Sequence, residues 1–159
     1  MKKFLKFLVI VIPWFIGGLI FRSDGNFYKS INKPFFAPPS IIFPIVWTIL
    51  YILIAISIYM VYKDNNFSET KGYNKALLIN YVSNQFFSFL FFTLKSPFLA
   101  LIDTVIVLIS SLFLYYETKE LNKKASNFLI PYIIWNAFAT ILIIFIFFMN
   151  LNEQSQNKF

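Results

Sequence analysis

The side chains best suited to chemistry in this sequence belong to two tryptophans, Trp47 and Trp135. The chain has only three tryptophans. These two lie well inside long apolar stretches, away from the membrane interfaces where tryptophan usually collects. An indole ring offers a broad aromatic face, an N–H donor and a readily oxidised ring. These properties suit stacking against a flat ligand, or photochemistry with one. Core packing is the alternative interpretation.

Around Trp47, aromatic residues repeat at helical spacing. Phe43, Trp47 and Tyr51 follow one another at intervals of four and therefore share one helix face. A stripe of this kind can equally face lipid or pack against a neighbouring helix, because the chain contains 22 phenylalanines. The stripe alone does not separate a ligand pocket from ordinary packing.

Polar side chains also repeat at helical spacing within apolar stretches. They form two sets, Asn80, Asn84 and Ser88 beside Gln85, then Tyr132, Asn136 and Thr140. Inside a membrane such groups face other helices or a cavity, not lipid. Interhelical hydrogen bonding is the alternative to a ligand site for both sets. For Asp103, which is the only acid in the expected core, a protonated or paired structural role is the favoured interpretation.

Several kinds of site are excluded by composition. The chain has no cysteine and no histidine, which removes the common ligands of zinc, copper and haem iron and also Cys/His nucleophilic catalysis. We expect no metal site and no bound cofactor. The net charge of +7 comes mainly from lysines in loops and at helix ends. This placement favours anionic lipid headgroups over nucleic acid as the partner.

The elements that must position these residues are membrane helices. The sequence is 58% hydrophobic and 13% charged, which is too little polar surface for a water-soluble domain. Apolar runs long enough to cross a bilayer predict an all-α membrane protein, a five-transmembrane-helix bundle forming one domain over residues 1–159. The first run follows three lysines and resembles a signal peptide, but it lacks a small-residue cleavage site, so a retained helix is preferred. The expected spans are about 4–21, 41–62, 73–94, 98–116 and 127–150.

The longest connection, about residues 22–40, is expected to be an ordered, lid-like loop. Pro34, Pro38 and Pro39 restrict its backbone, and Phe35 and Phe36 can lie against the end of the bundle. Nine of the 14 Lys and Arg residues fall on the N-terminal side of the expected membrane. The positive-inside rule then places the N-terminus in the cytoplasm and this loop outside.

Four blocks of this sequence together resemble the translocator protein family, the tryptophan-rich sensory proteins (TspO/MBR). They are "KPFFAPPSIIFPIVWTILY" at 33–51, "NYVSNQFFSFLFF" at 80–92, "ALID" at 100–103 and "PYIIWNAFATIL" at 131–142. The resemblance covers nearly the whole chain. This sequence departs from the family at Phe36 and Phe43, where Trp and Gly are usual, and at Gln85 and Phe86, near a common Trp. No Tyr followed by Lys or Arg comes after Thr140, so sterol recognition by that element of animal members is not implied.

The resemblance implies a five-helix bundle, often a homodimer, with a pocket under the first loop that takes porphyrins and benzodiazepine-type ligands. Carried over by position, the pocket residues are Tyr28, Trp47, Tyr51, Asn84, Phe87, Ser88, Trp135 and Ala139. Trp47 and Trp135 would be catalytic only if the activity is photochemical. Arg22, Lys29 and Lys33 are candidates to pair with the carboxylates of a porphyrin such as protoporphyrin IX.

Four functions remain open at this point. The first is a porphyrin (tetrapyrrole) sensor or scavenger in a bacterial cell membrane. The others are a light-dependent enzyme that degrades protoporphyrin IX, a carrier of porphyrin or lipid, and a structural partner for other membrane proteins. Because no histidine or cysteine is present, a metal-free porphyrin suits the chain better than haem.

Overall fold

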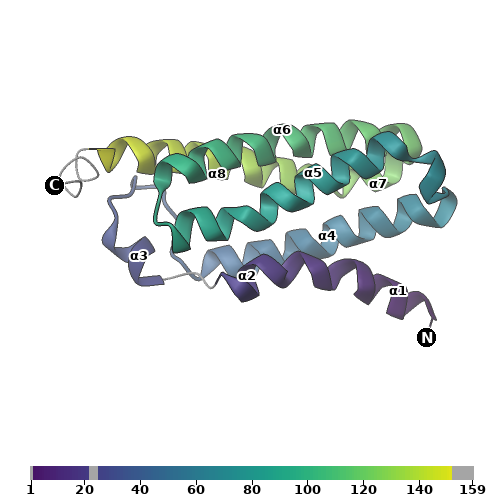
Figure 1. Cartoon of the computed structure of the whole chain (residues 1–159), viewed down its shortest axis with the longest axis horizontal. Helices are drawn as coiled ribbons and strands as arrows, with labels where there is room; N and C mark the ends of the chain where they lie inside the picture. The colour runs from purple at the N-terminus through teal and green to yellow at the C-terminus, as the bar shows by residue number, and fades with distance from the viewer. Residues whose placement is uncertain (1, 22–24, 152–159) are drawn as a thin grey trace.

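A computed structural model describes residues 2–21 and 25–151, and this part of the chain is helical with no strand. Its elements, in order, are α1 Lys2–Val11, the 3-10 turn η1 Ile12–Phe15, α2 Ile16–Ile20, α3 Gly25–Ser30, α4 Ile42–Asp64, the 3-10 turn η2 Phe67–Glu69, α5 Lys71–Ser88, the π-helical turn η3 Phe89–Thr93, α6 Pro97–Leu121, α7 Lys123–Asn127 and α8 Ile130–Met149. The long helices run side by side along one axis (Figure 1).

Four helical stretches of the described chain are long and apolar enough to cross a membrane. They are Ile42–Asp64, Lys71–Thr93, Pro97–Leu121 and Lys123–Met149. The predicted all-α membrane bundle is confirmed at this level. The first expected span is shorter, an apolar helix over Leu5–Ile20 interrupted by η1, so a fifth crossing remains a prediction.

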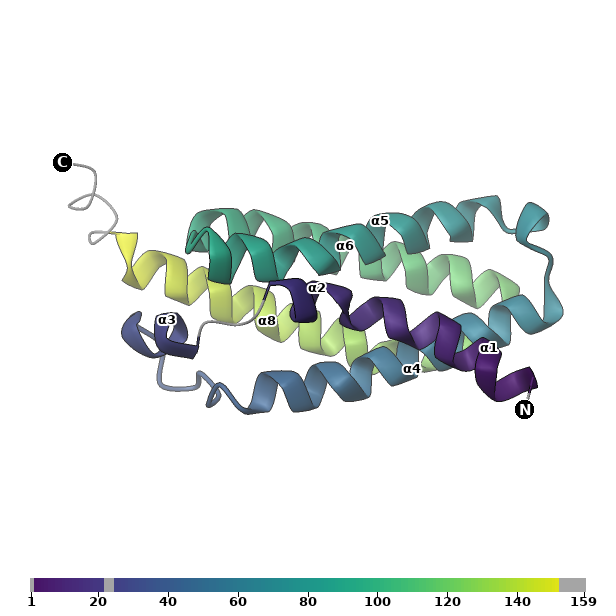
Figure 2. The ribbon, with the colours of Figure 1, turned by 60° about the horizontal axis from the view of Figure 1, so that its bottom comes forward.

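Helix one, which consists of α1, η1 and α2, is interrupted because of Pro13. Proline has no N–H and its ring clashes with the preceding turn, so it kinks or breaks a helix. Here the chain tightens into η1, and the Ile16 N–H donates to the Pro13 carbonyl. Below the break α1 packs on α4, and above it α2 packs on α5. Figure 2 shows helix one crossing α4 and then turning towards α5.

Helix ends carry recognisable signals. Ser96 caps α6 by accepting from the Leu99 N–H at 3.3 Å, with Pro97 in the first turn. Asn122 caps α7 through the Ala125 N–H at 2.9 Å. The α6 helix extends to Leu121, beyond the predicted end near residue 116, because its last turn is charged and leaves the apolar layer without ending the helix.

The loop between α2 and α4 is ordered across one end of the bundle over its described part. It contains the short helix α3, which was not expected from the sequence, followed by two turns in which the Ala37 N–H donates to the Pro34 carbonyl and the Ile42 N–H to the Pro39 carbonyl, each at 3.0 Å. The Tyr28 hydroxyl donates to the Pro38 carbonyl at 2.9 Å. At the far side, the Asn150 side chain pairs with both backbone groups of Asn32, at 3.0 Å and 2.9 Å. The loop is thereby fastened to the C-terminal end of α8.

Large apolar side chains cover the outer faces of the helices. Leu19 is 69% exposed, Leu78 61% and Phe113 62%. Such exposure is costly in water and natural where lipid is the solvent. Together with the long apolar helices, it supports a multi-pass membrane protein.

Candidate functional site

A cavity of about 320 Å³ lies beneath the loop, between α2, α3, α4, α5, α6 and α8. All eight residues carried over by position line it: Tyr28, Trp47, Tyr51, Asn84, Phe87, Ser88, Trp135 and Ala139. Its volume is at the lower end of the roughly 300–1,000 Å³ typical of small-molecule sites. That these residues bind a ligand stays a prediction.

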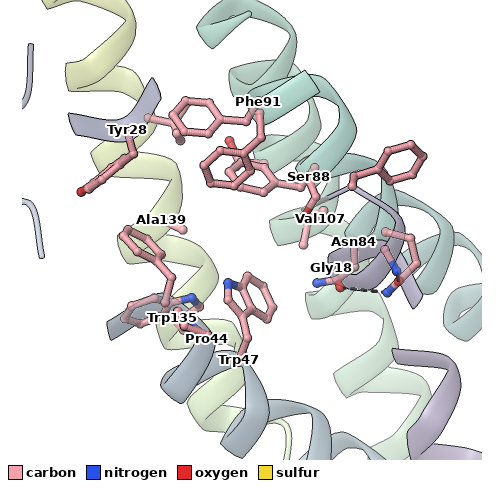
Figure 3. Close-up of a pocket in the computed structure, with 18 of the residues that line it drawn as sticks. Gly18, Tyr28, Pro44, Trp47, Asn84, Ser88, Phe91, Val107, Trp135 and Ala139 are labelled. Atoms are coloured by element: carbon pink, nitrogen blue, oxygen red, sulfur yellow. Dashed lines mark hydrogen bonds between the residues drawn. The ribbon is translucent and has the colours of Figure 1, made fainter. Parts of the chain in front are cut away.

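The two tryptophans come from separate helices and meet at this cavity. Trp47 lies in the N-terminal half of α4 and Trp135 near the start of α8 (Figure 3). The Trp47 ring centroid is 5.4 Å from that of Tyr51, and the Trp135 centroid is 5.3 Å from that of Phe138. The buried Nε1 of Trp135 has no hydrogen-bond partner within the described chain. Because a buried, unpaired donor is costly, this N–H is available to an acceptor on a ligand.

Most polar groups near the cavity are satisfied by one another. The Tyr51 hydroxyl donates to Asn84 Oδ1 at 3.0 Å, and Asn84 Nδ2 donates to the Tyr132 hydroxyl at 3.2 Å. The Tyr132 hydroxyl donates to Asn80 Oδ1 at 3.1 Å, and Asn80 Nδ2 to Ser110 Oγ at 3.0 Å. This chain joins α4, α5, α6 and α8. The expected interhelical hydrogen bonding is therefore present, and it leaves the cavity mainly aromatic.

Sequence reasoning missed the aromatic wall at the end of α5. The π-helical turn η3 brings Phe91 and Phe92 to the cavity beside Phe87. The Phe87 and Phe91 rings stack with centroids 5.5 Å apart and planes at 15°. A π-helical turn shifts the register of a helix and is frequent at functional sites. The phenylalanine-rich run 86–92 gives no sign of where such a shift falls, so period-3.6 reasoning could not place these side chains.

Tyr28 closes the cavity on the loop side. It is 5% exposed, and its ring packs against that of Phe43 at 5.3 Å. Burial raises the pKa of the Tyr28 hydroxyl above its ordinary value. The hydroxyl consequently stays protonated at neutral pH and keeps donating to the Pro38 carbonyl.

Of the candidates for carboxylate pairing, the two described lysines, Lys29 and Lys33, do not line the cavity. Lys33 Nζ donates to the Tyr28 and Ile31 carbonyls, each at 2.7 Å, at the C-terminal end of α3, where a cation is favourable. Lys29 is exposed in the last turn of α3. Arg22 lies outside the described residues. That these three residues pair with ligand carboxylates stays a prediction. The Lys33 ammonium group already donates to backbone carbonyls.

Asp103 lies outside the cavity wall, although its neighbour Thr104 is part of it. The Asp103 side chain is 6% exposed, and its buried Oδ2 has no hydrogen-bond partner among the described residues. No group of three or more metal-ligating side chains occurs in the described part of the chain. The arrangement offers aromatic faces and hydrogen-bond donors to a ligand, and no acid–base pair.

Comparison with known proteins assigns the chain to a family. The family model for the TspO/MBR family matches residues 6–149. The chain is 39% identical to "Uncharacterized membrane protein YtaB" of Bacillus subtilis, over 95% of this chain and 100% of that protein. It is 35% identical to "Tryptophan-rich protein TspO" of Bacillus cereus, over 81% of this chain and 84% of that protein. It is 30% identical to "Translocator protein homolog" of Schizosaccharomyces pombe, over 82% and 80% respectively. With the four signature blocks in order and the tryptophans of two of them brought to one cavity, the chain belongs to the TspO/MBR family of tryptophan-rich membrane proteins.

Proposed function

We propose that this protein binds a flat, largely apolar ligand of the porphyrin class in the cavity and acts as a sensor or scavenger of tetrapyrroles. The observation that carries this proposal is the unpaired Nε1 of Trp135 in a cavity walled by aromatic rings. Aromatic faces stack on a macrocycle. The indole N–H can donate to a carbonyl or carboxyl oxygen on the same ligand. Benzodiazepine-type molecules combine the same two features and belong to the proposed ligand range.

In this proposal, the carboxylates of the ligand point towards the loop end of the cavity. Lys29 lies on α3, close in sequence to Tyr28, which lines the cavity, and its side chain is exposed. Lys33 and Arg22 are the further candidates. A propionate reaching the headgroup layer would meet these cations while the ring stays among the aromatic side chains.

Light-dependent degradation of protoporphyrin IX is the second candidate function. It is favoured by one observation, the 5.4 Å separation of the Trp47 and Tyr51 rings, which places two oxidisable side chains together at the cavity. In this case Trp47 and Trp135 would support a reactive intermediate. Transport of porphyrin or lipid is a third candidate, tested by uptake into proteoliposomes.

The deciding experiment is a titration of the purified protein with protoporphyrin IX, first in the dark and then under illumination. Saturable binding with a stable porphyrin absorption band in light supports a sensor or scavenger. Loss of the band in light that depends on the protein supports the degrading enzyme. No saturable binding in the dark would contradict both. We further propose a homodimer in a bacterial cell membrane with the N-terminus in the cytoplasm, which crosslinking and reporter fusions at each end would test.

A further inference from the structure

The Gln85 side chain forms hydrogen bonds with the backbone of helix one at the break caused by Pro13. In a regular helix the Gly17 N–H would donate to the Pro13 carbonyl, but that carbonyl accepts from the Ile16 N–H and from the Tyr81 hydroxyl, the latter at 3.1 Å. The Gly17 N–H instead donates to Gln85 Oε1 at 2.6 Å, and Gln85 Nε2 donates to the Trp14 carbonyl at 3.3 Å. One side chain thereby satisfies two backbone groups that the break leaves without helical partners.

This pairing holds α2 close against α5. A Cβ atom added at Gly17 would lie 2.7 Å from Gln85 Oε1 and 2.9 Å from the Gln85 carbonyl oxygen, so only glycine permits the approach. Because α1 packs on α4 while α2 packs on α5, helix one diverges from the first turns of α4. Figure 2 shows α2 standing apart from the start of α4.

The exposed part of the cavity wall lies on the two sides of this separation. The exposed lining residues are Gly18 and Leu19 on α2, Ser40 in the loop before α4, and Pro44 and Thr48 on α4. The lining residues from α5, η3, α6 and α8 are buried or half-buried. On the loop side Tyr28 is 5% exposed and fastened to Pro38. The cavity therefore opens sideways, between α2 and α4.

The rim of this opening is apolar. Residues 16–21 and 41–49 contain no charged side chain, and Ile20 and Ile45 are 65% and 52% exposed beside it. The Thr48 hydroxyl donates to the Pro44 carbonyl at 2.7 Å, so it is satisfied within α4. A rim of this composition suits lipid hydrocarbon and not water.

We infer that the cavity is loaded from the lipid bilayer through a lateral portal between α2 and α4, and that Gln85 is the positioning residue that keeps α2 away from α4. The inference rests on the proposed function only in taking this cavity as the binding site. A portal of this kind narrows the ligand class to molecules that dissolve in the membrane before they bind. The aromatic part of the ligand would enter the cavity first.

The test uses a cysteine reporter, because the natural chain has none. Ala139→Cys places a thiol on the inner wall of the cavity, and the protein is reconstituted in liposomes. The labelling rate is measured with N-phenylmaleimide, which partitions into lipid, and with a charged methanethiosulfonate sulfonate, which stays in water. Phe35→Cys, at a fully exposed loop position (100%), confirms that both reagents are active.

The portal is then obstructed from either side by Gly18→Phe or Thr48→Phe. A Cβ atom at Gly18 meets nothing within 4 Å, so a side chain can begin there without a clash, and Thr48→Phe serves if Gly18→Phe does not fold. Ile49→Phe, on the exposed outer face of α4, is the matched control.

We expect N-phenylmaleimide to label Ala139→Cys faster than the charged reagent does. Each obstructing variant should slow this labelling about tenfold, equivalent to roughly 1.4 kcal/mol in the barrier, and Ile49→Phe should leave it unchanged. Equal labelling by both reagents, or rates unaffected by obstruction, would overturn the portal. Because no porphyrin is present, the result is independent of the dark titration, in which absence of binding would contradict the proposed function alone.

Discussion

At the scale of single residues, the indole N–H of Trp135 is the group best placed to form a hydrogen bond with a ligand. It is buried without a partner in the described structure, as is Nδ2 of the adjacent Asn136, while the cavity side chains Asn84 and Tyr51 bond to each other. A folded protein rarely leaves a buried donor unpaired. An acceptor supplied by a bound molecule would remove that cost.

Trp135→Phe should weaken protoporphyrin IX binding, because phenylalanine keeps most of the apolar surface but lacks the N–H donor. Trp47→Phe should weaken it as well, through lost stacking. We expect about 1 kcal/mol for each change, measured as the shift in dark titrations.

Trp14→Phe is the matched control for these variants. Trp14 packs 5.7 Å from Tyr51 but is not among the residues that line the cavity, so its replacement should change stability more than affinity. If the Trp47 and Trp135 variants bind like the wild type and also bleach the porphyrin like it in light, the ligand site lies elsewhere.

Lys29→Gln should weaken binding of dicarboxylic protoporphyrin more than binding of its dimethyl ester, because only the diacid offers carboxylates for an ion pair. An exposed pair contributes about 0.2–1 kcal/mol, so the expected effect is a few-fold. Lys33→Gln is the less informative variant, since Lys33 also binds carbonyl groups at the end of α3. Equal loss for both porphyrins would remove Lys29 from the carboxylate role.

At the scale of elements, helix one is interrupted at Pro13, and a side chain from α5 forms hydrogen bonds with its backbone at the interruption. The sequence shows the cause of the break but not its repair, because Gln85 lies 68 residues from Gly17. Gln85 occupies a region where the family often carries a tryptophan. An aromatic side chain there could not satisfy both the Gly17 N–H and the Trp14 carbonyl.

Gln85→Leu should destabilise the protein, because it leaves those two backbone groups unpaired in an apolar setting. An unsatisfied buried group costs about 1–3 kcal/mol, so we expect a loss of about 2 kcal/mol, measured by thermal unfolding in detergent. Phe86→Leu, at the next position and 51% exposed, should change stability much less. Similar losses in both variants would argue against the pairing.

The loop over the cavity is held at its far side by Asn150. Asn150→Ala removes both hydrogen bonds to the Asn32 backbone, at 3.0 Å and 2.9 Å, and should loosen the loop. We expect faster amide hydrogen exchange across residues 25–41, since local opening sets the exchange rate. Asn127→Ala, at an exposed position on α7, is the control. Unchanged exchange in Asn150→Ala would show that packing alone holds the loop.

At the scale of the whole molecule, composition limits the chemistry. The sequence contains neither histidine nor cysteine, the two most common strong axial ligands of haem iron. What the fold presents instead is a membrane-embedded aromatic cavity.

Protoporphyrin IX should therefore bind more tightly than haem. The measurement is a pair of absorbance titrations in the same detergent, with the porphyrin dimethyl ester as a check on partitioning. Haem binding of equal or greater affinity, with the spectrum of low-spin iron held by two axial ligands, would contradict this prediction.

The sequence by itself determined the solvent and the long helices. Apolar run lengths predicted five spans, of which four are confirmed as long apolar helices, since membrane insertion depends on local hydropathy. The signature blocks indicated Trp47 and Trp135. Only the tertiary structure decided the rest. The register shift at η3, the pairing of Gln85 with helix one and the capture of Lys33 by α3 carbonyls each depend on groups meeting in space. Local periodicity carries no information about which partner a polar group will find across the bundle. The sideways opening of the cavity also depends on tertiary contacts, because it follows from the packing of α2 on α5.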